Sequence, residues 1–149
     1  MQAPINIKNK KAWFNYEFLE KFVAGIRLSG TEIKSIRQGK VSLVESYCSF
    51  LNHELFVHNM SIAEYSHRGY SSHIPDQDRK LLMNRKELNR LEKKVNEKGL
   101  TIVVLRVFIN DRGLAKLEIA LAKGKREYDK REDLKKKDAK RDMERLRKY

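Results

Sequence analysis

Apolar and polar residues alternate along much of the first 122 positions, which is typical of short half-buried strands. Residues 13–28 are rich in aromatic side chains with polar residues between them, so this stretch favours strand structure. Residues 41–65 read as two or three shorter strands, with Asn52-His53 as a hairpin turn. Residues 100–109 and 114–122 predict a long hairpin around a turn at 110–113, with Leu117, Ile119 and Leu121 facing one way.

Two other segments have helical spacing instead. Residues 32–38 predict a short helix, because Ile33 and Ile36 share a face and Ser29 or Thr31 can cap its start. Residues 78–98 predict a longer helix that ends before Gly99. The apolar face of this longer helix would comprise Leu81, Leu82, Leu88, Leu91 and Val95.

These elements predict a mainly β protein with flanking helices. Several short antiparallel strands with one or two packed helices favour an OB-like antiparallel β-barrel over residues 1–122. Residues 66–78 hold turn-forming residues without periodicity and predict a loop. An OB-like barrel often binds oligonucleotides, although a fold alone does not establish a function.

Composition narrows the class of partner. The 149 residues include 33 Lys and Arg against 20 Asp and Glu, a net charge of +13, which favours polyanions. The longest apolar run, residues 100–105, is far short of the roughly 20 residues that span a bilayer. No secretory signal is visible, and the single Cys48 excludes an intramolecular disulfide. We therefore expect a cytoplasmic protein that does not bind a membrane.

The basic charge is concentrated in residues 123–149, where 13 basic residues accompany 7 acidic ones. Only Ala139, Met143 and Leu146 line up as an apolar stripe, which is too thin to hold a helix on the barrel. The segment predicts a tail that is disordered or fraying alone and helical against an anionic surface. A solvated tail that aids solubility is the simpler alternative, but Tyr128 and Tyr149 could stack on bases.

The sequence offers no motif for catalysis. Gly25 and Gly30 have the spacing of a phosphate-binding loop, but Thr31 occupies the position of the required lysine. The four histidines and the cysteine lack zinc-ligand spacing, and no nucleophile motif organises the serines. We expect a binding protein with no catalytic residue, no metal and no cofactor.

Specific strings along essentially the whole chain resemble the SmpB family of SsrA-binding proteins. They occur in order and at the spacing of that family: Asn9-Lys-Lys-Ala12, Tyr16, Ala24-Gly-Ile26, Gly30-Thr-Glu-Ile-Lys-Ser35, Arg37-Gln-Gly-Lys40, Glu45-Ser-Tyr47, Arg79-Lys-Leu-Leu-Met83, Gly99-Leu-Thr101, Ala122-Lys-Gly-Lys-Arg126 and Tyr128-Asp-Lys-Arg131. The resemblance implies a monomeric adaptor that binds transfer-messenger RNA and delivers it to stalled ribosomes. The barrel would hold the tRNA-like domain of that RNA. The tail would enter the empty messenger channel near the decoding centre and fold into a helix there.

The resemblance also implies two groups of site residues. For transfer-messenger RNA they are Asn9, Lys10, Lys11, Tyr16, Gly30, Glu32, Lys34, Leu82 and Lys116. For the ribosome they are Lys123, Gly124, Lys125, Arg126, Tyr128, Asp129, Lys130, Arg131, Lys135, Lys136, Arg141, Arg145 and Arg147.

Several of these residues have a plain structural interpretation as well. Glu32 could cap a helix, Leu82 could be core, and Gly30 could supply a turn. Val23 and Gln77 depart from the family pattern, which usually has an acidic residue and an arginine at these positions. A structural ribosomal or general nucleic-acid-binding protein remains the main alternative, and DNA is not expected as a partner. A phosphodiester-cleaving enzyme is a third hypothesis.

Overall fold

The structure is a computed structural model that describes residues 5–65, 72–97 and 99–125, with Arg131, Leu134, Lys135 and Arg141. No helix in these described ranges is long and apolar enough to cross a membrane. Their elements are β1 (Asn6–Lys8), α1 (Lys10–Asn15), β2 (Tyr16–Ile26), α2 (Gly30–Arg37), β3 (Val41–Ser42), β4 (Tyr47–Leu51), β5 (Glu54–His58), β6 (Ser61–Ile62), β7 (Arg79–Leu82), α3 (Arg85–Val95), β8 (Leu100–Ile109) and β9 (Ala115–Gly124).

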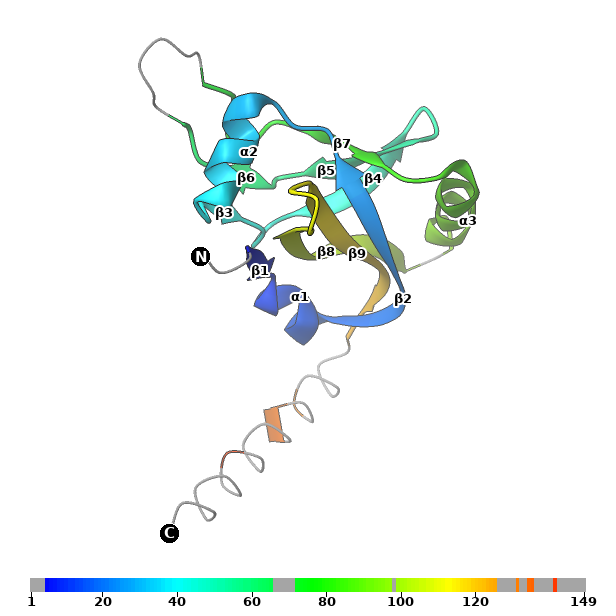
Figure 1. The fold of residues 1–149 in the computed structure, drawn as a ribbon. Helices are drawn as coiled ribbons and strands as arrows, with labels where there is room; N and C mark the ends of the chain where they lie inside the picture. The colour runs from blue at the N-terminus through cyan, green and yellow to red at the C-terminus, as the bar shows by residue number, and fades with distance from the viewer. Residues whose placement is uncertain are drawn as a thin grey trace.

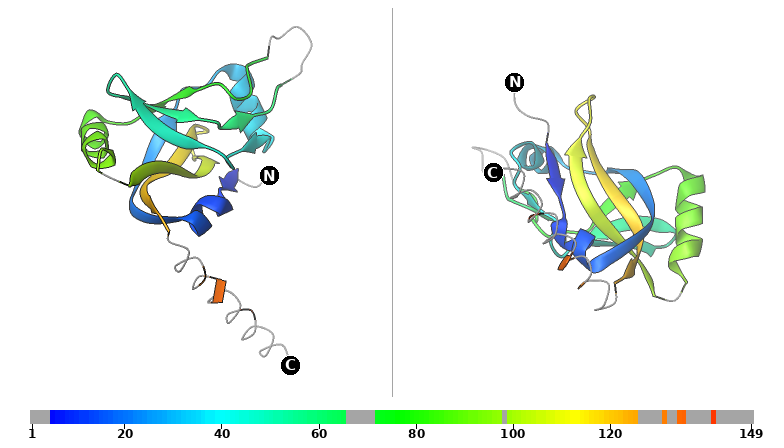
Figure 2. Two further views of the ribbon diagram at one scale, coloured as in Figure 1. Left: turned by 180° about the vertical axis from the view of Figure 1, so that it is seen from behind. Right: turned by 90° about the horizontal axis from the view of Figure 1, so that it is seen from below.

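An antiparallel sheet in the order β1-β8-β4-β5-β7-β2-β9 closes on itself, because β8 also pairs with β9 (Figure 1). β1 and β4 share one edge of β8, at residues 106–108 and 102–103 respectively. Helices α2 and α3 lie on opposite sides of this barrel, and α1 lies near its base (Figure 2). The predicted mainly β fold, an antiparallel barrel with flanking helices, is confirmed.

The barrel interior is filled by the inward residues of the long β8–β9 hairpin and of its neighbours. Leu117, Ile119 and Leu121 are buried there, as the alternation predicts. The opposite face of the same hairpin is buried as well, because α1 packs over it. This second cluster contains Ala12, Val103, Leu105, Ala120 and Ala122.

The predicted helix over residues 78–98 is partly wrong. Residues 79–82 form β7, which pairs with both β2 and β5 and places Leu81 inside the barrel. The helix α3 begins only at Arg85, after Asn84, whose side chain accepts a hydrogen bond from the backbone N–H of Glu87. Pairing of residues 79–82 with β2 on one side and β5 on the other outweighs the helical spacing of the leucines. The Asn84 cap then sets the start of the helix.

The strand predicted over residues 13–28 begins late, at Tyr16. Residues 10–15 form the helix α1 instead. This helix is too short to reveal a 3.6-residue period, and its only buried residue is the small Ala12. The aromatic side chains of Trp13 and Phe14 therefore resemble the start of a strand in the sequence.

Other local predictions are confirmed. The α2 helix has a capping box, in which Ser29 and Glu32 each bond the backbone of the other, and Gly39 follows with a φ of 74°. Asn52 and His53 have φ values of 50° and 65°, as a two-residue hairpin turn requires. Cys48 is a buried, unpaired thiol on β4, and burial raises its pKa.

Candidate RNA-binding surfaces

The residues expected to contact transfer-messenger RNA fall into two groups at opposite ends of β2. β2 pairs with β9 so that Tyr16 lies opposite Gly124 and Gly25 lies opposite Lys116. Gly25 is nine positions after Tyr16 on β2, which corresponds to about 30 Å along a strand. Asn9, Lys10, Lys11 and Tyr16 are at the first end, whereas Gly30, Glu32, Lys34, Leu82 and Lys116 are toward the second.

The second end contains an open cavity of about 330 Å³, which we call the hairpin groove. Leu82, at the end of β7, leaves 51% of its surface exposed, so it is not a core residue. Leu114 is exposed beside it, and Lys116 and Arg37 bring two cations to the same groove. The lining residues are Gly25, Ile26, Leu28, Ile33, Arg37, Leu82, Gly113, Leu114, Ala115 and Lys116.

Lys116 and Leu82 lie on the two sides of Gly25, because β9 and β7 both pair with β2 at this residue. A Cβ atom at Gly25 would lie 3.5 Å from Lys116 Nζ and 3.4 Å from Leu82 Cβ. The lysine ammonium therefore lies directly over the bare backbone of Gly25 and beside an exposed apolar side chain. A cation next to an apolar surface can contact a phosphate and a sugar or base of one nucleotide.

Glu32 is buried and takes part in an ion pair inside the protein. Its carboxylate pairs with the guanidinium of Arg79, accepts a hydrogen bond from the Ser29 backbone N–H at 2.9 Å and another from Gln77 at 3.2 Å. Burial disfavours the charged form, but the Ser29 hydrogen bond and Arg79 outweigh it, so the pKa of Glu32 lies below its ordinary value. This geometry joins α2 to β7.

The partner Arg79 is equally buried and is held by backbone carbonyls as well. Its guanidinium donates to the carbonyls of Met60 at 2.6 Å, Pro75 at 2.9 Å, Gln77 at 3.1 Å and Ile74 at 3.3 Å. Arg79 thereby orders the chain that enters β7, three residues before Leu82. The Glu32–Arg79 ion pair therefore fixes α2 and β7, which line the hairpin groove, but it is itself shielded from solvent.

Gly30 and Lys34 lie in α2. Gly30 is the first residue of the helix, with open space where a side chain would be, and it has no positive φ that would require glycine. Lys34 is exposed and lies over the ring of Tyr65 at 5.3 Å from its centroid. Both residues are therefore accessible from the solvent side of α2.

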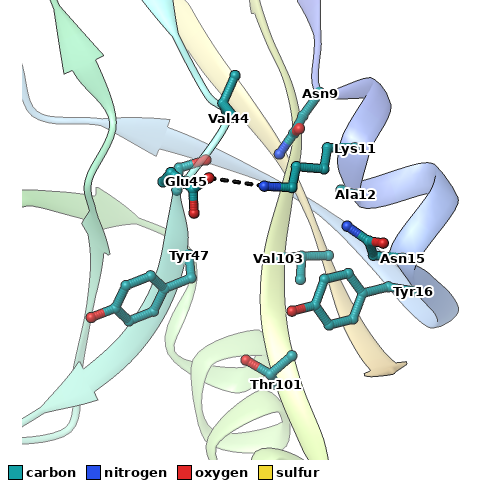
Figure 3. A pocket seen from close by; sticks show the side chains of 11 residues that line it. Asn9, Lys11, Ala12, Asn15, Tyr16, Val44, Glu45, Tyr47, Thr101 and Val103 are labelled. Atoms are coloured by element: carbon teal, nitrogen blue, oxygen red, sulfur yellow. Dashed lines mark hydrogen bonds and ion pairs between the residues drawn. The ribbon is translucent and has the colours of Figure 1, made fainter. Parts of the chain in front are cut away.

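The first end of β2 contains a second open cavity of about 350 Å³, which we call the α1 pocket (Figure 3). Tyr16 and Tyr47 stand on its two sides, and Lys11 at its rim pairs with Glu45 at 2.9 Å. The lining is mostly polar, with two aromatic rings and three small apolar side chains. It comprises Asn9, Lys11, Ala12, Asn15, Tyr16, Val44, Glu45, Ser46, Tyr47, Thr101 and Val103.

Asn9, which lines the α1 pocket, holds neighbouring backbone segments together. Its side-chain amide donates to the carbonyls of Leu43 at 3.1 Å and Val104 at 3.0 Å, and its backbone N–H donates to Leu105 at 2.8 Å. Both amide hydrogens are thus used within the protein. Lys10, the next residue, is exposed.

The start of the basic tail is fixed beside the α1 pocket. Lys123 and Gly124 are the last residues of β9, and both are exposed. The next residue, Lys125, donates its backbone N–H to the Asn15 carbonyl at 2.9 Å and its ammonium to the Trp13 carbonyl at 3.3 Å. A cation at the carbonyl end of α1 is favourable.

Of the remaining tail residues expected to meet the ribosome, Arg131, Lys135 and Arg141 are helical and exposed. The others lie outside the described residues: Arg126, Tyr128, Asp129, Lys130, Lys136, Arg145 and Arg147. Within the described ranges, no three His, Cys, Asp or Glu side chains are grouped so that they could hold a metal ion.

Most lining residues of the two cavities were not among the expected site residues, and these include Gly25 and Arg37 in the hairpin groove and Tyr47 and Thr101 in the α1 pocket. The sequence contained a signal for two of them. A glycine within a strand marks a close approach of other groups, which applies to Gly25. Tyr47 precedes the buried Cys48 on β4, so alternation places its ring outside the barrel.

Comparison with known proteins gives consistent matches along the chain. The family model of the SmpB protein matches residues 6–149. A protein named SsrA-binding protein from Christiangramia forsetii is 60% identical over 148 residues, covering 99% of this chain and 94% of the relative. One of the same name from Thermosipho melanesiensis is 46% identical over 141 residues, covering 95% and 94%. A solved structure described as "tmRNA-SmpB: a journey to the center of the bacterial ribosome" has a TM-score of 0.69 and 43% identity, covering 87% of this chain and 94% of that one.

Proposed function

This chain belongs to the SmpB family, and from that premise we propose that it is a non-catalytic, cytoplasmic adaptor that binds transfer-messenger RNA and delivers it to stalled ribosomes. The observation that carries the proposal within this molecule is the hairpin groove. Two of the residues expected to contact this RNA, Leu82 and Lys116, meet there although they are 34 positions apart in the sequence.

The hairpin groove has the chemistry of an RNA contact. Lys116 and Arg37 supply cations for phosphate oxygens, and Leu82 and Leu114 supply exposed apolar surface for a sugar or a splayed base. Glu32 supports this contact from inside, because its ion pair with Arg79 positions both α2 and β7. We propose that this end of the barrel holds the tRNA-like domain.

The tail would serve the second partner, the ribosome. We propose that residues 1–122 bind transfer-messenger RNA and residues 123–149 bind the messenger channel near the decoding centre. The first two tail residues continue β9, and Lys125 is tied to the end of α1. The basic tail would thus leave the barrel from a fixed point, and its net positive charge favours a polyanionic channel.

A truncation separates the two activities. A chain that ends at Lys125 keeps the described contacts of the barrel, so we expect it to bind the tRNA-like domain within about threefold of the full chain's affinity. It should fail to support peptide tagging in a translation extract supplied with a messenger that lacks a stop codon. The matched control is full-length K116A, which should lose RNA affinity while it keeps the tail. Loss of RNA binding in the truncated chain would contradict the division.

The main alternative is a structural ribosomal or general nucleic-acid-binding protein, because a net charge of +13 alone attracts any polyanion. Competition binding distinguishes the two. A general binder would release transfer-messenger RNA to equal masses of transfer RNA or duplex DNA. The proposed adaptor would retain it against both competitors.

The non-catalytic part of the proposal has a sharp test at Ser49. Ser49 Oγ lies 2.5 Å from His58 Nε2, and His58 Nδ1 lies 2.8 Å from Asp78, the order of contacts in a serine hydrolase triad. A fluorophosphonate probe labels an activated serine. We expect no labelling of Ser49 above that of the S49A variant, and clear labelling would contradict a purely adaptor role.

A further inference from the structure

We infer that the α1 pocket binds a single unstacked nucleobase, held between Tyr47 and Tyr16. The inference rests on the proposed function for the class of its ligand, RNA, and adds a second RNA contact about 30 Å along β2 from the hairpin groove. It assigns a role to Tyr47, which was not expected at the site, and specifies the role of Tyr16.

The pocket offers an aromatic ring on each of two sides. Thr101 and Val103 of β8 form its floor, and the rings of Tyr16 and Tyr47 stand on either side of them (Figure 3). The floor and the Tyr47 wall come from paired strands, since Tyr47 lies opposite Val103 on β4 and β8, whereas Tyr16 begins β2. A cavity of about 350 Å³ is at the small end of the roughly 300–1,000 Å³ of ligand sites, which suits one base.

Tyr47 is oriented before any ligand arrives. Its ring packs against His58, with centroids 4.9 Å apart and an angle of 34° between the planes. Ser49 and Asp78 hold the two nitrogens of the His58 ring at 2.5 Å and 2.8 Å. The Ser49–His58–Asp78 chain is therefore a brace for Tyr47, which remains 44% exposed. An aromatic ring fixed in this way loses little entropy on stacking.

Polar groups surround the proposed base. Asn15 brings a side-chain amide and Thr101 a hydroxyl to the pocket wall, and both can hydrogen-bond the edge of a base. Asn9 cannot donate its amide hydrogens, because Leu43 and Val104 accept both. Lys11 is exposed at the rim, where a phosphate that flanks a bound base would lie, and the preceding residue, Lys10, is exposed as well.

This chemistry selects an unpaired nucleotide over other ligands. A base inside a duplex is already stacked on both faces, so it cannot enter a pocket between two side chains. A helical peptide would require an extended apolar groove, whereas the apolar lining of this pocket is limited to Ala12, Val44 and Val103, among amide, hydroxyl and charged groups and the two rings. Stacking on an aromatic ring is worth about 1–3 kcal/mol per base.

The base could come from transfer-messenger RNA or from ribosomal RNA, because the α1 pocket lies near the regions that we propose bind each of them. The pocket belongs to the barrel, which we propose binds the tRNA-like domain. It also lies beside the start of the tail, because Tyr16 pairs with Gly124 and Asn15 accepts from Lys125. The experiment must therefore offer both RNAs.

The test measures four full-length proteins, namely the wild type, Y47A, Y47F and L51A, against each RNA. One arm titrates the isolated tRNA-like domain, and the other titrates ribosomes stalled on a truncated messenger. L51A is the matched control, because Leu51 is an exposed residue on the same strand and outside the pocket. We expect Y47A to lose about 5- to 150-fold in affinity in one arm, as the stacking energy implies, and Y47F and L51A to stay within twofold.

The arm that responds identifies the source of the base. An unchanged affinity of Y47A in both arms would overturn the inference, and so would an equal loss in Y47F, because the ring would then not be what binds. If the wild type binds neither RNA in preference to transfer RNA, the proposed function fails instead. Photocrosslinking of RNA that carries 5-iodouridine gives a second measurement should Y47A fold poorly. A crosslink to Tyr16 or Tyr47 supports the pocket, and crosslinks confined to other residues contradict it.

Discussion

Replacing Glu32 should destabilise the whole fold, because its carboxylate neutralises the buried guanidinium of Arg79. Removal of one partner from a buried pair typically costs about 3–5 kcal/mol. Arg79 would keep its hydrogen bonds to four backbone carbonyls, so we place E32A at the lower end, about 3 kcal/mol. In a domain of this length that corresponds to a melting temperature lower by about 6–12 °C.

The variant E32Q removes the negative charge of Glu32 and keeps the size and shape of its side chain. A glutamine has one accepting oxygen, which can keep the hydrogen bond from the Ser29 backbone N–H, but its NH2 group then faces Arg79 and cannot accept. E32Q should therefore lose nearly as much stability as E32A, about 2–3 kcal/mol. The matched control is E45A, which removes an exposed ion pair with Lys11 whose side chains are 55% and 72% exposed. Such surface pairs contribute about 0–1 kcal/mol, so E45A should melt close to the wild type.

The stability of the wild type should also depend on pH through Glu32. Its pKa in the folded protein is lowered from the ordinary 4.5, so the unfolded chain binds the proton more readily. The stabilisation is therefore fully present above pH 4.5 and is lost as the pH falls through the folded pKa. We expect the difference in unfolding free energy between wild type and E32Q to be largest near pH 7 and to shrink below pH 4.5.

Urea unfolding followed by circular dichroism at several pH values measures these differences, and a filter-binding titration measures RNA affinity in parallel. We expect E32A to lose stability and RNA affinity together, because α2 and β7 are both displaced. An E32A protein that is as stable as the wild type but no longer binds RNA would refute this reasoning. Glu32 would then have to contact the RNA itself.

Three further changes test other parts of the structure. L82A and K116A should each weaken binding of the tRNA-like domain by about 3- to 30-fold in a filter-binding assay with little change in melting temperature, since Leu82 is half exposed. N9A should cost about 1–3 kcal/mol in urea unfolding, because it removes two buried hydrogen bonds, those from the Asn9 amide to the carbonyls of Leu43 and Val104. Native Cys48 should resist a thiol reagent until the protein unfolds, because burial raises its pKa and blocks access.

The sequence predicts the barrel where strands follow a strict alternation and end at specific turn residues. The β8–β9 hairpin is the clearest case, since Leu117, Ile119 and Leu121 point inward as expected. Its outer face also carries the buried residues Ala120 and Ala122, which a pattern for one buried face does not predict. They are covered by α1, a helix of six residues that is too short to show a period.

The β7 strand shows why local spacing can mislead. Leu81, Leu88 and Leu91 repeat as a helix face would, yet Leu81 belongs to a strand. Strand pairing with β2 and β5 is a long-range interaction that no local window contains. The same limit applies to Arg79, whose role depends on Glu32, 47 positions earlier in the chain.

The candidate site also depends on contacts between residues that are far apart in the sequence. The resemblance to the SmpB family named Leu82 and Lys116, but only the fold brings them to one groove beside Gly25. Tyr47 and Thr101 could not be assigned to a pocket from the sequence, because the pocket is built from α1, the start of β2, β4 and β8. The structure also separates the expected RNA contacts into two places, which a linear list of residues does not reveal.

The most direct test of the central claim is the identity of the RNA that co-purifies with the full-length protein from its native cells. Sequencing of that RNA, compared with total RNA from the same lysate, gives an enrichment for each species. An adaptor of the proposed kind should enrich transfer-messenger RNA strongly over transfer RNA. Recovery of transfer RNA and ribosomal RNA in proportion to their abundance, with no such enrichment, would contradict the account.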